Sequence, residues 1–120
     1  MASLTIANRA GEHLLDELRN LSSDPIILAA GQNLVAGSVL GRVTSSGSYA
    51  IFDPSALDGT AVAAGVLFDA VDASSGDRPA VAHTFGCAVV RDRLAWKGGL
   101  TDPQKADGLA DLLRLGIKAR

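Results

Sequence analysis

Short apolar segments, each ended by a turn signal, fill the middle of the sequence and restrict the possible folds more than any other feature. Clusters of glycine, proline, serine and aspartate lie between them, as between the strands of all-β proteins. The Ser/Gly cluster at residues 45–48 joins two segments as an expected hairpin, and Pro54 ends the second because proline lacks the N–H of a sheet ladder. This spacing predicts a mainly β fold, a small barrel or bent ribbon. The expected strands cover residues 26–30, 38–44, 49–52, 61–71, 80–85 and 87–91.

The core expected for these strands is thin, although 120 residues are enough for one independently folding domain. The apolar fraction is 48 %, but 20 residues are alanine, and the aromatic residues are three Phe, one Tyr and one Trp. Alanine removes little area from water, so oligomerisation would reinforce such a core. One expected strand, at residues 61–71, is apolar on both faces, which is typical of a strand covered on both sides.

A single short helix is expected near the end of the chain, at about residues 102–115. Thr101 is the candidate N-cap, with Gln104 at capping-box spacing and a proline in the first turn. Gly116 suits the position after the helix, and residues 117–120 can form a short strand. The spacing of four apolar residues predicts a stripe that faces the core. They are Ala106, Leu109, Ala110 and Leu113.

The first 24 residues differ from the rest because they are polar and mixed, and they end just before Pro25. Within them Leu14, Leu15 and Leu18 stand at helical spacing. Two interpretations remain open: a tail with a frayed helix, or an arm that orders on a partner. We therefore divide the chain into an arm, flexible when free, at residues 1–24 and a β-rich domain at residues 25–120.

Charge and composition argue against several classes of function. The net charge of −2 and the scattered basic residues do not provide the basic face that nucleic-acid binding needs. No apolar run is long enough to span a membrane, and the first residues lack the pattern of a secretory signal. A single cysteine cannot form an intrachain disulfide. The expected location is a bacterial-type cytoplasm or a particle assembled there.

Residues that could carry chemistry do not form a recognisable site, so we predict no catalytic residue, no cofactor and no metal. His83 alternates with apolar neighbours in a strand pattern and is expected to pack there, while His13 lies in the polar segment. Cys87, among small and apolar residues, is expected to be buried and inert. The glycine-rich stretches match no nucleotide-binding motif. Turn formation explains the loop aspartates better than calcium binding does. These are Asp53, Asp58, Asp69, Asp72 and Asp77.

The one tryptophan, Trp96, precedes the expected helix and has two interpretations. A lone tryptophan in this position is usually a core anchor. It can also be a hot spot of an interface, where tryptophan is enriched.

An ordered series of motifs resembles the head decoration (capsid cement) proteins of tailed bacteriophages, the lambda-type family. The longest is the run at residues 30–44, AGQNLVAGSVLGRVT, which resembles the opening motif of that family. The likeness covers residues 11–120, although the family pattern has a longer, proline-rich leader where this chain has spaced leucines. Further matches are Tyr49, Asp53-Pro54, Asp58-Gly59, residues 62–67, 72–77 and 94–96, the expected helix, and residues 115–117.

The resemblance implies a structural role and a β-clip-like fold with one small helix. Such proteins are homotrimers at the threefold positions of the expanded head, where they clamp the major capsid protein against internal DNA pressure. An N-terminal arm meets the capsid, adding a strand to one of its sheet edges. No enzyme activity, cofactor, nucleic acid, membrane or small-molecule substrate is implied. The candidate capsid contacts are Leu14, Leu15, Leu18, Ile26 and Trp96.

Two other classes of function remain as alternatives to the interpretation as a phage head decoration protein. One is a non-viral β-barrel module that binds or accompanies a larger assembly. The other is a small hydrolase or lyase, which would need His83 beside a carboxylate in a cleft.

Overall fold

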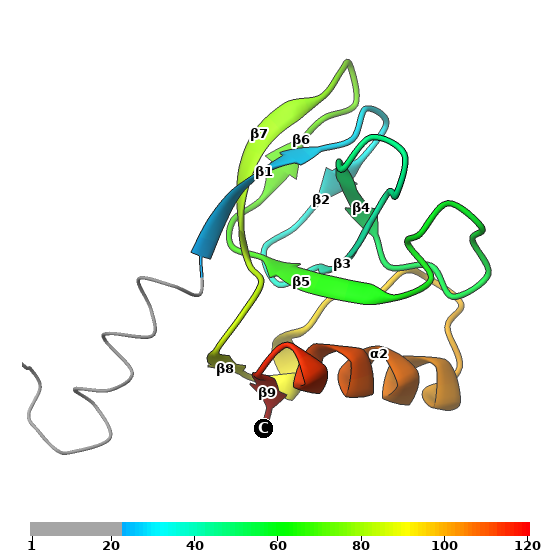
Figure 1. Ribbon diagram of the computed structural model, residues 1–120, viewed down its shortest axis with the longest axis vertical. Coiled ribbons are helices and arrows are strands. Elements are labelled where there is room, and N and C mark those ends of the chain that lie inside the picture. The colour runs from blue at the N-terminus through cyan, green and yellow to red at the C-terminus, as the bar shows by residue number, and fades with distance from the viewer. Residues whose placement is uncertain (1–22) are drawn as a thin grey trace, which may run out of the picture.

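The computed structural model describes residues 23–120, and its main element is a small closed barrel of five strands (Figure 1). These strands are β1 (Ser23–Leu28), β3 (Val39–Arg42), β4 (Tyr49–Ile51), β5 (Ala63–Leu67) and β7 (Arg78–His83). They follow the order β1, β4, β3, β5, β7 around the barrel. Neighbours are antiparallel except β1 and β4, which are parallel. The expected mainly β fold with one short C-terminal helix is confirmed.

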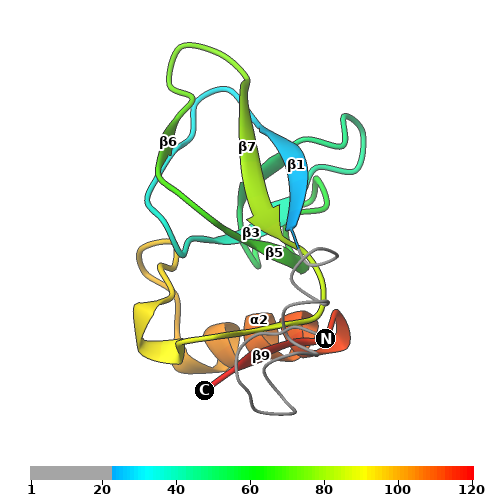
Figure 2. The same cartoon turned by 90° about the vertical axis from the view of Figure 1, so that its left-hand side faces the viewer.

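Two short ribbons and the helix lie outside the barrel. They are β2 (Asn33–Leu34) with β6 (Val71–Asp72), β8 (Cys87–Val89) with β9 (Ile117–Ala119), the 3-10 turn η1 (Arg91–Arg93) and the helix α2 (Asp102–Arg114). The helix forms a second layer below the barrel, and β9 lies beside the C-terminal end of α2 after the chain turns (Figures 1 and 2). The chain therefore has a barrel layer and a helical layer.

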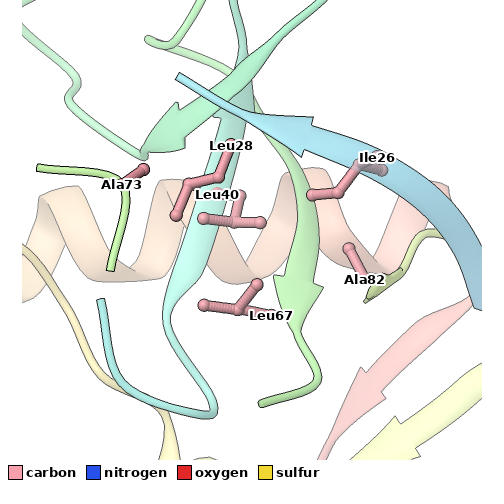
Figure 3. Close-up of a cluster of buried hydrophobic side chains, with 6 residues drawn as sticks. All are labelled: Ile26, Leu28, Leu40, Leu67, Ala73 and Ala82. Atoms are coloured by element: carbon pink, nitrogen blue, oxygen red, sulfur yellow. The ribbon is translucent and has the colours of Figure 1, made fainter. Parts of the chain in front are cut away.

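Buried side chains form two cores that share β3 and β5. Val39 and Leu40 are adjacent in β3 and enter different cores, because successive side chains of a strand point to opposite faces. The same alternation in β5 leaves both strands covered on both faces. The barrel interior holds Ile26, Leu28, Leu40, Leu67, Ala73 and Ala82 (Figure 3). The space between the barrel and α2 holds Val39, Phe52, Ala63, Val66, Leu112 and Ile117.

The expected hairpin is confirmed, while the long strand at residues 61–71 is only partly so. In the hairpin, β3 pairs with β4 and Leu40 lies opposite Ile51. In the long run, β5 ends at Leu67, and the chain bends at the exposed Phe68. The run divides here because the following residues leave the barrel and form β6, which pairs with β2.

The first and last strands also differ in extent from those expected. β1 begins at Ser23, two residues before Pro25, and pairs with β7 along its whole length. β8 is a strand as expected but lies outside the barrel, where it pairs in parallel with β9. The expected short strand at the end of the chain is therefore present, as the partner of β8.

The helix begins and ends as predicted. The Thr101 side chain accepts a hydrogen bond from the Gln104 N–H at 3.3 Å, and the Gln104 side chain accepts one from the Thr101 N–H at 2.9 Å. Gly116 follows the helix with φ 84°, the left-handed conformation that glycine adopts at little cost.

The predicted core-facing stripe of this helix is wrong. Gly108 and Leu112 are the buried residues of α2, whereas Leu113 is 60 % exposed. Aromatic rings explain the rotation, because a Cβ on Gly108 would lie 2.8 Å from the Trp96 ring and 3.0 Å from the Phe52 ring. The helix therefore turns its smallest residue to the core, and the stripe faces outward. Of its other members, Leu109 is half-buried, and Ala106 and Ala110 are exposed.

Candidate interaction surfaces

The candidate contacts from the sequence lie in different environments. Leu14, Leu15 and Leu18 fall outside the described residues, 23–120. Ile26 is 7 % exposed and packs inside the barrel (Figure 3), so its side chain has little surface for a partner. Trp96 is half-buried, and its ring meets the Phe52 ring edge-on, with centroids 6.0 Å apart. The structure thus places Trp96 in the second core, in agreement with the core-anchor interpretation.

An apolar hollow of about 230 Å³ lies where β5 and β7 approach the chain after β8; we call it the Phe68 hollow. Phe68 and Val90 stand at its margin with 60 % and 59 % of their surface exposed. The Phe68 ring packs edge-on against His83, with centroids 5.6 Å apart. Exposed apolar groups around a concavity are typical of a protein-binding surface. The hollow is lined by Gly37, Val66, Leu67, Phe68, His83, Val89, Val90, Arg93 and Leu94.

A second concavity, of about 250 Å³, lies between α2 and β9; we call it the α2–β9 groove. The outward-facing stripe of the helix supplies its apolar wall, and two cationic residues, Arg91 and Lys118, also line it. The apolar spacing of this stripe was visible in the sequence, but its exposure was not. Its lining residues are Arg91, Leu109, Ala110, Leu113, Ile117, Lys118 and Ala119.

A third concavity, of about 610 Å³, lies where β1 and β4 diverge; we call it the β1–β4 seam. The two strands pair at one register position only, Leu28 opposite Tyr49. Pro25 and Pro79 line the seam, and proline on a strand edge offers no N–H to an added strand. This chemistry makes the seam a poor template for strand addition.

Three of the loop aspartates close turns, as predicted. Asp53, Asp58 and Asp72 each accept hydrogen bonds from the hydroxyl and the N–H of the residue two positions on, which is serine or threonine. These bonds, led by the hydroxyl, lower the pKa of all three carboxyl groups below the ordinary value. The other two also bond to backbone: Asp69 to the Ala70 N–H and Asp77 to the Ala30 N–H.

We expect the domain to lose stability in acid because of these turns. A carboxyl group whose pKa is lower in the folded state stabilises the fold above its unfolded pKa, here 3.8. That contribution is lost as the pH falls through the lower folded pKa. The contribution of these carboxyl groups to the melting temperature should therefore be constant above about pH 5, and the melting temperature should fall below about pH 4. A variant with Asp53, Asp58 and Asp72 changed to asparagine should show a shallower fall, and an equal slope would contradict this origin.

The remaining reactive groups are dispersed. No group of three or more His, Cys, Asp or Glu side chains that could hold a metal ion occurs within residues 23–120. Cys87 is half-buried beside the second core, and burial raises the pKa of its thiol, which keeps it protonated. In the same part of the chain, no helix is long and apolar enough to cross a membrane.

Comparison with protein-family models matches residues 3–117 to the family described as bacteriophage lambda head decoration protein D. A search of curated proteins finds no match. The family match spans almost all of the chain and agrees with the resemblance seen in its motifs. It identifies a structural component of the phage head, for which exposed apolar concavities are more relevant than a catalytic cleft. The chain therefore belongs to the bacteriophage lambda head decoration protein D family.

Proposed function

We propose that this protein is a capsid cement that binds the expanded head of a tailed phage and stabilises it against the pressure of packaged DNA. The observation that carries the proposal is the family match over residues 3–117. The partner is the major capsid protein, and the protein is made in the host cytoplasm before it joins the outer surface of the head. The apolar concavities, found on a chain of low net charge, supply surface suited to such contacts.

We further propose that the working form is a homotrimer at the threefold positions of the head. The barrel interior supports this, because alanine supplies two of its six buried residues and the core is accordingly thin. Association would bury more apolar area per chain. Light scattering at micromolar concentration should give three times the chain mass of 12.3 kDa. A monomer both in solution and on the head would contradict the trimer.

The protein should raise the temperature at which DNA-filled heads rupture. A ligand stabilises the state that it prefers, and at a free concentration of a hundred times Kd the gain is about 2.7 kcal/mol per site. Each trimer contacts several capsid subunits and the lattice repeats the contact, so many modest clamps act together. The measurement is the rupture temperature of full heads with and without added protein.

The same experiment at low and high salt tests the character of the contact. An apolar contact should depend only weakly on salt, whereas a charge-driven contact is screened within about a Debye length. Unexpanded heads are the control, because they should bind less protein. An unchanged rupture temperature with binding confirmed would remove support for the cement role.

A further inference from the structure

Strand β9 has one edge without a backbone partner among residues 23–120. Arg120, just after β9, donates its N–H to the Val89 carbonyl and accepts from the Arg91 N–H, so its polar groups face β8. Backbone groups alternate in direction along a strand, so Ile117 and Ala119 direct theirs to the opposite edge. Within the described residues, 23–120, β9 pairs with β8 in a ribbon of two strands. Ile117 is 1 % exposed, so the accessible part of the free edge is at Ala119, which is half-buried and presents one N–H and one C=O group to a further strand.

The α2–β9 groove places an apolar wall beside β9. Leu113 is 60 % exposed, and Leu109 and Ala110 lie one turn before it on the same face of the helix. These residues face the groove because Gly108 occupies the buried side of α2 under the Trp96 ring. An extended segment in the groove would bond to β9 and place every second side chain against the leucines.

Cationic side chains surround the groove without acidic partners in the described part of the chain. Arg91 and Lys118 line the groove, and Arg120 follows directly after β9. The ion pairs among residues 23–120 are Lys97 with Asp53 and Arg114 with Asp111, so none involves these three residues. The rim thus complements a partner segment that carries carboxylates. Because the rim is exposed, its charges select the partner more than they supply affinity.

We propose that the α2–β9 groove receives an extended segment of the capsid protein by strand addition to β9. The segment has apolar side chains at alternate positions and at least one carboxylate beside them. This inference rests on the proposed cement function and adds a second attachment to the one predicted for the N-terminal segment. The β1–β4 seam is the larger concavity, but its prolines disfavour the same mode of binding.

The test compares the binding of four full-length proteins to expanded heads. Leu113→Glu puts a charge on the apolar wall, and Ala119→Pro removes an N–H from the free edge without removing a bond to β8. Leu57→Glu is the matched control, because Leu57 is fully exposed in a loop that lines none of the three concavities. We expect the first two changes to weaken binding by about tenfold or more, while Leu57→Glu binds like the unchanged protein. Hydrogen exchange of the C-terminal peptide, residues 115–120, should also slow on the head.

The outcomes separate the inference from the function on which it rests. If all four proteins bind equally, the groove is not the contact and the cement function stands. If the unchanged protein fails to bind heads, the proposed cement function is wrong, and the inference that rests on it is wrong as well. If Leu113→Glu changes the mass of the free protein in light scattering, the groove lies between copies of this chain, and the inference is wrong. If Ala119→Pro lowers the melting temperature, its binding result is set aside because the fold itself is perturbed. The comparison of Leu113→Glu with Leu57→Glu then decides whether the groove binds the capsid.

Discussion

Replacing Gly41 with alanine should lower the free energy of unfolding by about 3 kcal/mol, the upper part of the range for overpacking. Gly41 is buried in β3, and a Cβ there would lie 2.6 Å from the carbonyl oxygen of Thr60 and 2.9 Å from its carbonyl carbon. These are backbone atoms, so relief requires the loop at Thr60 to move away from the barrel. The pairing of β3 with β5 shifts register between Leu40 and Gly41, which leaves this position tightly constrained.

Urea unfolding of the purified protein measures the effect, and Gly98→Ala is the matched control. A Cβ at Gly98 would have no atom within 4 Å, and the Gly98 backbone is not in the left-handed conformation. Alanine is therefore tolerated at this position. Gly98→Ala should leave the free energy of unfolding unchanged or raise it by up to about 1 kcal/mol, because alanine reduces the conformational entropy of the unfolded chain. Equal urea midpoints for Gly41→Ala and Gly98→Ala would contradict this prediction, because they would show that the Thr60 loop moves away without loss of stability.

Removing residues 1–22 should abolish binding to expanded heads and leave the melting temperature nearly unchanged. If residues 1–24 are the capsid-binding arm that the sequence predicts, their loss removes that attachment, whereas both described cores are built from residues at or after Ile26. The cut belongs before Ser23, because β1 begins there and pairs along its whole length with β7. Co-sedimentation with heads measures binding, and calorimetry measures the thermal transition.

A full-length variant with Leu14, Leu15 and Leu18 changed to serine separates the leucines from the rest of the arm. It should bind heads more weakly than the unchanged protein if these side chains are the anchors. A truncated protein that binds as tightly as the intact chain would overturn the arm proposal altogether. A truncated protein that unfolds would instead show that the first 22 residues belong to the folded domain.

Local signals predicted much of the fold, and long-range contacts account for most of what they missed. The Thr101–Gln104 capping box and the hairpin between β3 and β4 depend on residues close in sequence, and both are present. The rotation of α2 depends on Phe52, which is more than 50 residues away and packs against Gly108. Helical spacing locates an apolar face, but it does not say whether the rest of the fold covers that face.

The candidate site was harder to predict for the same reason. The sequence allows Trp96 to be a core or an interface residue, and its contact with Phe52 places it against the second core. The apolar run around Phe68 predicts a strand covered on both faces, yet the chain bends at Phe68 and exposes the ring. The sequence motifs did identify the family, because a long ordered series of matches does not depend on knowing which faces are exposed.

The antiparallel pairing of β1 with β7 decides how the domain would carry tension. A pull on Ser23 along the strand axis loads β1 in shear, so its ladder bonds to β7 share the force instead of breaking one after another. The Thr84 hydroxyl also donates to the Asp24 carboxylate and ties the loaded end to the chain after β7. If a capsid held the chain at this end, the β1–β7 pairing would resist a force along the strand axis far better than a force perpendicular to it.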